Sequence, residues 1–251
     1  VGQSRRVTSG AEAVTMIHDA MRDFAHSRPR PIHIEIPLDI LEGPSDVPAS
    51  ATAPRPLGAP QPAPASDVAA AAAALAAASL PVILAGGGSL AAGSQLLELA
   101  ELLEAPVITT TNGKGAIPEK HRLSLGADLR LTTAHTFMRT ADALLVIGSK
   151  VGEAELWGGD ITPQGPIIRV DIMRDQMLCN LTSDIEVPGN SAAVVPQLLE
   201  ALRADSGSGV GDREAPDLRE VFDAMDNEGR QWAPDLAALN ETIMEVVPDN
   251  T

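Results

Sequence analysis

The sequence predicts a parallel, doubly wound α/β sheet with partial flanking domains at both ends. Through the middle of the chain, short apolar segments alternate with amphipathic helical segments, which is the order of elements in such sheets. One apolar segment, Pro81–Ala85, runs without a polar residue into three glycines. A continuous apolar run of this kind is typical of a parallel strand buried on both faces. Each end of the chain carries too few elements to bury a core of its own.

The composition of the 251 residues excludes several classes of protein. Hydrophobic residues make up 44% and charged residues 21%, which predicts a globular chain with a sizeable core. The net charge of −16 repels nucleic-acid phosphates, and the 2% aromatic content offers few stacking platforms for bases. A single cysteine, Cys179, excludes an internal disulfide, and no histidine has metal-ligand spacing with partner acids. We therefore expect no nucleic-acid partner and no metal site.

The N-terminal region has no apolar segment typical of a signal peptide. No apolar run approaches the roughly 20 residues that a membrane-spanning helix needs. We therefore expect a cytoplasmic protein without a membrane partner.

The first part of the chain predicts one helix and one strand. Over residues 8–26, apolar residues recur at helical spacing after Thr8-Ser9 and Glu12, which have the spacing of a capping box. Strict alternation over residues 32–36 predicts a strand. Since one helix and one strand cannot form a domain, residues 1–43 are interpreted as the end of a larger domain.

Residues 44–65 are dominated by proline, alanine, serine and glycine. The prolines exclude a helix or a central strand and predict a semi-rigid, extended linker. An alanine-rich helix is predicted over residues 68–79, for which Ser66 and Asp67 supply candidate caps.

Residues 66–204 carry the elements of the central sheet. Apolar segments predict its strands at 81–85, 106–111, 143–147, 166–170 and 185–187. Helical periodicity predicts the helices at 68–79, 90–104, 133–140 and 191–202.

The last part of the chain begins with a predicted linker at residues 205–217, made mainly of glycine, serine and aspartate. Helices are predicted at 218–225 and 235–247, with nothing to pack against them. Residues 218–251 are therefore interpreted as the start of a further domain.

Ligands of parallel α/β sheets bind outside the carboxyl ends of the strands. This rule predicts a binding rim of residues at or directly after the ends of four predicted strands: Gly86, Gly87, Gly88, Thr110, Thr111, Gly148, Ser149, Lys150 and Asp171. A glycine turn there leaves backbone N–H groups bare at a helix N-terminus, where an anionic group is favoured. The alternative is a tight turn without a ligand, because the three glycines lack the spacing of a dinucleotide site.

Three further interpretations stay open at the rim. Asp171 closes a strand and either accepts ribose hydroxyls or caps the following segment. Lys114, between two glycines, either meets a phosphate or solvates a turn. His135, near a helix start, is interpreted as a structural histidine.

Six segments follow one another in an order found in one enzyme family: Arg28–Asp39, Ala85–Gly88, Pro106–Thr110, Gly113–Glu119, Ala141–Gly148 and Val170–Asp171. With these motifs the chain resembles the middle of a thiamine-diphosphate-dependent enzyme of the acetolactate synthase, benzoylformate decarboxylase and oxalyl-CoA decarboxylase kind. The resemblance implies a Rossmann-like central domain over residues 66–204. It also implies the end of a pyrimidine-binding domain over 1–43 and the start of a diphosphate-binding domain over 218–251.

The resemblance implies a parent enzyme, a transferase or lyase that acts on 2-oxo acids by carboligation or decarboxylation. It implies thiamine diphosphate and magnesium as cofactors. The family's activating glutamate would lie before Val1, and its metal-binding signature would lie beyond Thr251. We therefore expect no catalytic residue and no metal ligand within this chain, which would be inactive alone. Its expected role is structural, in a homodimer or homotetramer with the flanking domains as partners.

The alternative is a nucleotide-binding module, because some members of the family hold FAD or ADP in the central domain. At the two arginine positions of the family's flavin-binding segment, this chain has Lys150 and Ala154. Lysine lacks the planar fork with which arginine grips phosphates. The family's Gly-Met-His-Gly element is also absent, because residues 127–130 read Ala-Asp-Leu-Arg.

The terminal segments carry apolar side chains that need burial, namely Ile32, Ile34, Ile36, Leu236, Leu239 and Ile243. We expect these segments either to be disordered or to dock on a second copy of the chain.

Overall fold

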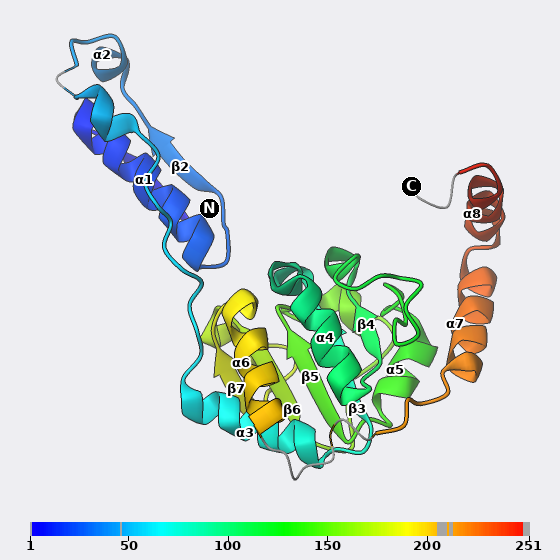
Figure 1. The fold of residues 1–251 in the computed structure, drawn as a ribbon. Coiled ribbons are helices and arrows are strands. Elements are labelled where there is room, and N and C mark those ends of the chain that lie inside the picture. The colour runs from blue at the N-terminus through cyan, green and yellow to red at the C-terminus, as the bar shows by residue number, and fades with distance from the viewer. Residues whose placement is uncertain (1, 46, 205–209, 211–212, 248–251) are drawn as a thin grey trace. The chain divides into compact units, whose positions relative to one another are not determined.

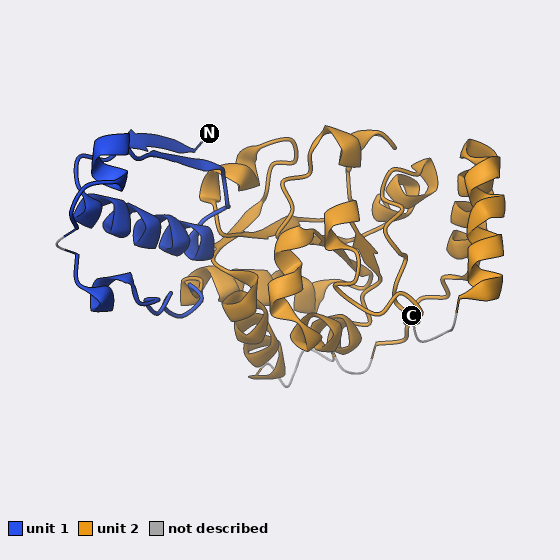
Figure 2. Cartoon of the chain, turned by 90° about the horizontal axis from the view of Figure 1, so that it is seen from above, with its two compact units in different colours: residues 1–61 blue, residues 62–251 orange. Residues whose placement is uncertain are grey.

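A computed structural model describes residues 2–45, 47–204, 210 and 213–247. The chain divides into two compact units, residues 1–61 and residues 62–251 (Figure 2). The finer domain boundaries expected from the sequence stay predictions.

Unit 1 is a small parallel βαβ arrangement. Strand β1 (Gln3–Arg6) pairs with β2 (Ile32–Glu35), and helix α1 (Gly10–His26) connects them. The capping box is confirmed: the Ser9 hydroxyl accepts from the Glu12 N–H, and the Glu12 carboxylate accepts from the Thr8 N–H. The predicted helix and strand are therefore confirmed, whereas β1 was missed.

The predicted linker is less extended than expected. A short helix α2 (Leu38–Leu41) precedes it, and residues Ala49–Thr52 form a 3₁₀ turn, η1. Two histidines of α1 donate to linker carbonyls: His18 Nε2 to Ala51 at 2.9 Å, and His26 Nε2 to Leu57. These bonds hold the segment along α1, so the expectation of an extended linker without helical turns is wrong for this part.

Unit 2 contains a five-stranded parallel sheet with the strand order β4-β3-β5-β6-β7. Its strands are β3 (Pro81–Ala85), β4 (Val107–Thr109), β5 (Ala143–Ile147), β6 (Ile167–Asp171) and β7 (Ile185–Pro188). All four pairings are parallel. The predicted doubly wound α/β fold is confirmed.

Helices cover both faces of this sheet (Figure 1). On the first face lie α3 (Ala65–Ala77), α4 (Ser94–Leu103) and α6 (Ser191–Ala204), packed on Ile83, Leu145 and Ile168. On the second face lie α5 (Thr132–Met138) and α7 (Arg219–Trp232), packed on Val82, Leu144 and their neighbours. Side chains alternate between the faces along each strand, so an entirely apolar strand such as β3 supplies both cores.

Two helix starts differ from the sequence prediction. The glycines after β3 enter a 3₁₀ turn, η2 (Gly87–Ala92), and α4 begins only after Gly93, whose φ is +56°. Helix α3 begins at Ala65 after Pro64, so Ser66 lies inside its first turn and does not cap it. The alanine-rich segment is helical, as predicted.

The expectation that the C-terminal helices have no core is wrong for α7. Leu218 and Met225 are buried in the core of the second face, and α7 packs on α5. The described residues of α8 (Pro234–Val246), in contrast, include no buried side chain. Most of the predicted linker 205–217 lies outside the described residues, but Arg213 donates to the carbonyls of Leu75 and Ala76 at 2.8 and 2.7 Å.

Candidate functional site

The predicted rim lies at the topological switch point of the sheet. After β3 the chain forms β4 on one side of it, and then crosses to form β5 on the other side. Ligands of open α/β sheets bind in the crevice that such a reversal leaves between the two strand ends. The segments at this crevice are Gly86–Gly88, after β3, and Gly148-Ser149, after β5.

Backbone packing closes this crevice. The Gly86 N–H donates to the Ile147 carbonyl at 2.8 Å, and the Gly88 N–H donates to the Gly148 carbonyl at 3.0 Å. A Cβ atom on Gly86 would lie 2.4 Å from the Gly148 oxygen, and one on Gly148 would lie 2.5 Å from the Gly88 Cα. Such distances exclude any side chain. The glycines therefore allow two turns to touch, which is the tight-turn interpretation.

Side chains complete the closure. The Ser89 hydroxyl donates to the Gly86 carbonyl at 2.6 Å, and the Ser191 hydroxyl donates to the Gly88 carbonyl at 2.6 Å. Gly87 is half-buried, and a Cβ there would lie 3.2 Å from Asn112. The expectation of bare N–H groups is wrong at Gly86 and Gly88, because both groups have protein acceptors.

The two threonines after β4 differ in exposure. Thr110 is buried; its N–H donates to the Ala85 carbonyl at 2.9 Å, and its hydroxyl accepts from the Gly113 N–H at 3.1 Å. It thereby caps the 3₁₀ turn η3 (Thr111–Gly113). Thr111 is exposed at the start of that turn.

The turn after β5 is strained. Ser149 is buried and its hydroxyl accepts from the Val151 N–H at 3.1 Å, whereas Lys150 is exposed. Val151 is fully buried with φ +47°, in the left-handed region that β-branched residues rarely adopt. Strain of this kind persists only where the surroundings enforce it.

A buried arginine that the sequence analysis missed helps to enforce this turn. Arg169, on β6, is fully buried and donates to the carbonyls of Ser149 at 2.7 Å, Cys179 at 3.0 Å and Leu181 at 2.5 Å. Burial lowers the pKa of Arg169, while the charge of Asp171 opposes this shift. Among the described residues, its Nε has no hydrogen-bond partner. The sequence did contain a signal for this residue, because a charged side chain between Ile168 and Val170 of a buried strand needs buried partners.

Asp171 fits the capping interpretation. Its side chain is 6% exposed, and its Oδ1 accepts from the Met173 N–H at 2.9 Å, ahead of the 3₁₀ turn η5 (Arg174–Leu178). The Asp171 carbonyl accepts from the Gly189 N–H at 2.9 Å. The carboxylate thus orders the chain that leaves β6.

Lys114 and His135 also fit their structural interpretations. Lys114 forms an exposed ion pair with Glu119 at 2.7 Å. His135 is fully buried in α5, and its Nε2 donates to the Leu129 carbonyl at 2.8 Å. Its Nδ1 has no hydrogen-bond partner in the part of the chain that the structure describes.

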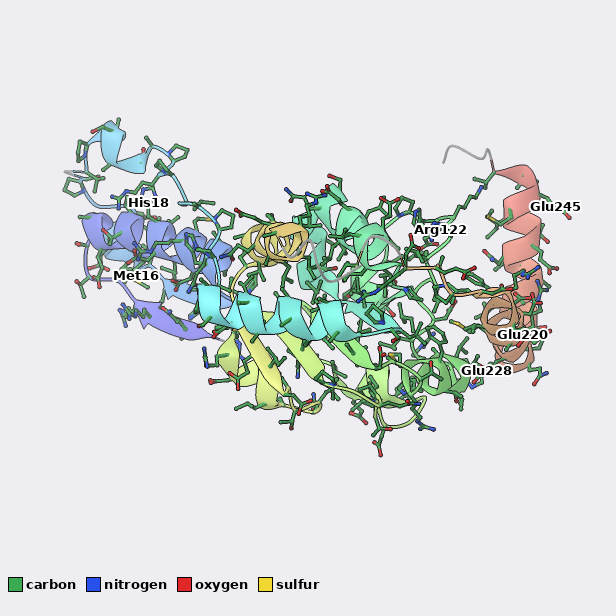
Figure 3. The ribbon with its side chains drawn as sticks, turned by 60° about the horizontal axis from the view of Figure 1, so that its bottom comes forward. Met16, His18, Arg122, Glu220, Glu228 and Glu245 are labelled. Carbon is green, nitrogen blue, oxygen red and sulfur yellow. The ribbon has the colours of Figure 1, made fainter. Side chains whose placement is uncertain are left out.

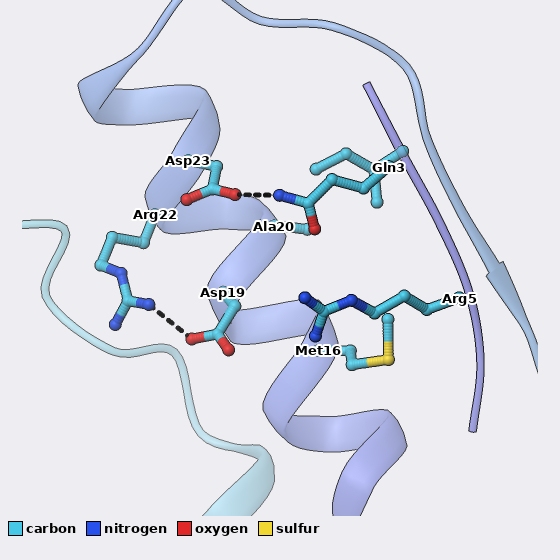
Figure 4. A pocket seen from close by; sticks show the side chains of 8 residues that line it. Gln3, Arg5, Met16, Asp19, Ala20, Arg22 and Asp23 are labelled. Atoms are coloured by element: carbon cyan, nitrogen blue, oxygen red, sulfur yellow. Dashed lines mark hydrogen bonds and ion pairs between the residues drawn. The ribbon is translucent and has the colours of Figure 1, made fainter. Parts of the chain in front are cut away.

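Unit 1 contains a small polar cavity of about 140 Å³ between α1 and its strands (Figure 4). Gln3 donates to Asp23 at 3.1 Å, and Arg22 donates to Asp19 at 2.7 Å. Arg5 and Met16 also line the cavity. Since these groups bind one another and are largely exposed, the cavity has no arrangement that selects a ligand.

The described residues offer neither a metal-binding cluster nor a membrane-spanning helix. Within the described ranges, no group of three or more His, Cys, Asp or Glu side chains could hold a metal ion. Of the helices that the structure describes, none has both the length and the apolar character needed to cross a membrane.

Comparison with known proteins identifies the family. A family model described as "Thiamine pyrophosphate enzyme, central domain" matches residues 68–198, more than half of the chain. The chain belongs to the thiamine pyrophosphate enzyme family. The resemblance seen in its motifs and the predicted fold class are both confirmed.

Relatives in the family carry two kinds of name. A probable 2-ketoarginine decarboxylase of Pseudomonas aeruginosa is 40% identical over 187 residues, covering 74% of this chain and 33% of that protein. A probable acetolactate synthase large subunit of Methanocaldococcus jannaschii is 36% identical over 193 residues, covering 70% and 32%. An acetolactate synthase of Mycobacterium bovis is 32% identical over 203 residues, covering 78% and 33%. The chain spans about a third of the length of these relatives.

The described residues do not fit thiamine diphosphate and magnesium. They provide no acidic cluster for the metal ion. The N–H groups of Gly86 and Gly88 donate to carbonyls within the protein, so these two groups are not free to bind a nucleotide phosphate.

Proposed function

We propose that this chain is the structural central part of a thiamine-diphosphate-dependent enzyme that acts on 2-oxo acids by carboligation or decarboxylation. Membership of the family supports the cofactor of the parent. The names of the relatives, a 2-ketoarginine decarboxylase and acetolactate synthases, support the reaction class.

The observation that carries the structural role is the closed switch point. The place where a nucleotide would bind is filled by the contact between Gly88 and Gly148, whose backbones leave no room for a Cβ atom. An anion at this crevice would have to replace the two backbone hydrogen bonds that join the strand ends. The central domain then contributes a rigid body, and the flanking domains of the parent hold thiamine diphosphate and magnesium.

The rest of the proposal follows the resemblance. The parent is a transferase or lyase of the cytoplasm and forms a homodimer or homotetramer. The chain itself supplies no catalytic residue. Docking of the exposed apolar side chains of α8 on a second copy stays part of this proposal, whereas Ile34 and Ile36 pack on the core of unit 1.

The alternative, a module that binds FAD or ADP, is favoured by one observation. Lys150 is exposed at the end of β5, next to the strained Val151, and could contact a phosphate from outside the closed crevice. A nucleotide would then bind along the surface of the rim.

Two measurements on the purified chain separate the proposals. We expect a colourless protein without a flavin absorbance band, and no heat of binding on calorimetry with ADP. A flavin band, or ADP binding lost in Lys150→Ala but retained in Lys114→Ala, would establish the nucleotide-binding module. Lys114 is the matched control because it is an exposed lysine on a neighbouring turn, paired with Glu119.

The reaction class needs the full-length parent. We expect it to release carbon dioxide from a 2-oxo acid when thiamine diphosphate and magnesium are present together. Calorimetry of the 251-residue chain with the same two ligands should show no binding. Micromolar binding by this chain would contradict the assignment of the cofactor site to other parts of the parent.

A further inference from the structure

One face of α7, with Leu218 just before it, contacts α5 and the loop that precedes α5. The face consists of Leu218, Val221, Met225, Glu228 and Trp232, spaced at i, i+3, i+7, i+10 and i+14. Residues at this spacing lie along one side of a helix. We call these five residues the docking face. Leu218 and Met225 are 4% and 5% exposed, and Val221 packs beside them.

The docking face covers an apolar surface built around α5. This surface consists of Leu129, Leu131, Ala134 and Met138, which belong to the same buried cluster as Leu218 and Met225. Figure 1 shows α7 beside α5 at the edge of unit 2. An amphipathic helix laid on an apolar surface with regularly spaced anchors is a recurrent recognition mode.

Glu228 adds a polar contact at the N-terminus of α5 (Figure 3). Its two carboxylate oxygens accept from the N–H groups of Thr132 at 2.7 Å and Thr133 at 2.8 Å. These are the first two residues of α5, and N–H groups at this position have no acceptor within their own helix. Leu131, the residue before the helix, cannot accept with its side chain. Glu228 therefore supplies the cap for α5 from 95 residues away in the sequence.

A cation–π contact extends the docking face beyond Glu228. The Arg130 guanidinium lies 5.4 Å from the centroid of the Trp232 ring. Both contacts come from one side of α7. The negative Glu228 carboxylate meets the N-terminus of α5, and the aromatic face of Trp232 meets the positive Arg130.

The contact ends where α7 ends. Helix α8 follows after one residue, and its apolar side chains Leu236, Leu239 and Met244 remain exposed. The position of α8 therefore depends on how α7 is held.

We propose that α7 is a clasp that closes on α5 through the docking face, with Glu228 as the residue that locks it. Closing caps α5 and covers its apolar surface; opening releases α7 and α8 together while the sheet and the helices of its first face stay folded. The proposal does not depend on the reaction of the parent or on a bound nucleotide.

Hydrogen exchange on the full chain tests the lock directly. In Glu228→Ala we expect the Thr132 and Thr133 amides to exchange at least tenfold faster, because their acceptor is lost, and the amides of α7 to follow. The amides of β3 and β5 should keep their protection. Glu220→Ala is the matched control, since Glu220 is an exposed acid on α7 outside the docking face.

Tryptophan fluorescence gives a second readout. The chain has two tryptophans, so a Trp157→Phe background leaves Trp232 as the reporter. We expect Glu228→Ala in this background to increase quenching of Trp232 by acrylamide, and Glu220→Ala to leave it unchanged.

Two results would overturn the proposal. Unchanged exchange at Thr132 and Thr133 together with unchanged quenching of Trp232 would mean that Glu228 does not hold α7. An equal loss of protection in β3 and β5 would mean that α7 is an inseparable part of the fold and not a clasp.

Discussion

The two faces of the five-stranded sheet differ in the kinds of contact that stabilise them. The first face, under α3, α4 and α6, is a large cluster of leucine, isoleucine, valine and alanine side chains. The second face, under α5 and α7, includes the buried Arg169 and His135, each with one nitrogen that has no partner among the described residues. It also includes the strained Val151 and the carboxylate cap from Glu228.

This difference shows that apolar packing dominates one side of the sheet, whereas a few directional contacts are added on the other side. Apolar contacts on the first face are numerous and close-packed, so its geometry depends on the fit of many side chains together. On the second face, a few directional contacts fix the turns after β5 and the position of α7. Loss of one such contact leaves a buried polar group without a hydrogen-bond partner. The resulting loss of folding free energy is larger than the net contribution of the hydrogen bond.

The largest expected effect is on the second face. Arg169→Ala removes the donors of three carbonyls and should lower the free energy of unfolding by about 3–5 kcal/mol. Arg169→Lys should recover part of this loss, because a lysine donates from a single point and cannot reach all three carbonyls. Denaturant unfolding followed by circular dichroism measures both. A lysine variant as stable as the wild type would show that the fork geometry of Arg169 is unimportant.

On the first face, a truncation should cost about as much as a cavity of its size. Leu99 is fully buried in α4, so Leu99→Ala should lower the free energy of unfolding by about 2–5 kcal/mol. Leu97→Ala, at a partly buried position of the same helix, is the control and should cost less. The comparison between the faces fails if Leu99→Ala increases hydrogen exchange at Ser149–Val151 as strongly as Arg169→Ala does.

At the carboxyl end of β3, substitutions of two neighbouring glycines should have different effects on stability. Gly86→Ala places a Cβ 2.4 Å from the Gly148 oxygen and should cost about 2–3 kcal/mol. In Gly87→Ala the nearest atoms, those of Asn112, are 3.2 Å away, so a cost below about 1 kcal/mol is expected. Thermal unfolding of the two variants checks the order. Equal costs would mean that the crevice between β3 and β5 opens to admit a side chain.

The smallest expected effect is the pH dependence of the cap. Burial raises the pKa of Glu228, but hydrogen bonds from Thr133 and Thr132 outweigh it and leave the pKa below the ordinary 4.5. A carboxyl with a lowered folded-state pKa stabilises the fold above its unfolded pKa, and this stabilisation is lost as the pH falls through the folded-state value. Wild type should therefore exceed Glu228→Gln by about 0.5–1 kcal/mol at neutral pH, and the gap should vanish in acid. A gap that persists well below pH 4.5 would contradict this assignment.

Much of unit 2 could be predicted from local pattern. The strands β3 and β5 are uninterrupted apolar runs, and such runs have few other stable arrangements. Strand β1 could not be predicted this way, because Gln-Ser-Arg-Arg has no apolar residue and its pairing with β2 decides its conformation. The start of α4 was also missed, since Gly93 adopts a conformation with positive φ that the apolar pattern of its neighbours does not predict.

The candidate rim could be placed from the sequence, but its chemistry could not. The positions of Gly86–Gly88 and Gly148 after successive strands predict their proximity. Whether they leave room for a ligand depends on backbone contacts between two turns about 60 residues apart, which no periodicity encodes. The roles of Arg169 and Glu228 could not be predicted for the same reason. Each side chain binds backbone groups that are distant in the sequence, so its partners are known only from the folded chain.

Arg213 has a mechanical consequence. It donates to carbonyls at the C-terminal ends of α3 and α4, which precede β3 and β4, so it lies at the end of the sheet opposite the rim. The chain passes this point on its way from α6, on the first face, to α7, on the second. A pull on the C-terminal helices would first load the contact of α7 with α5, and Arg213 ties the chain before α7 to the ends of α3 and α4.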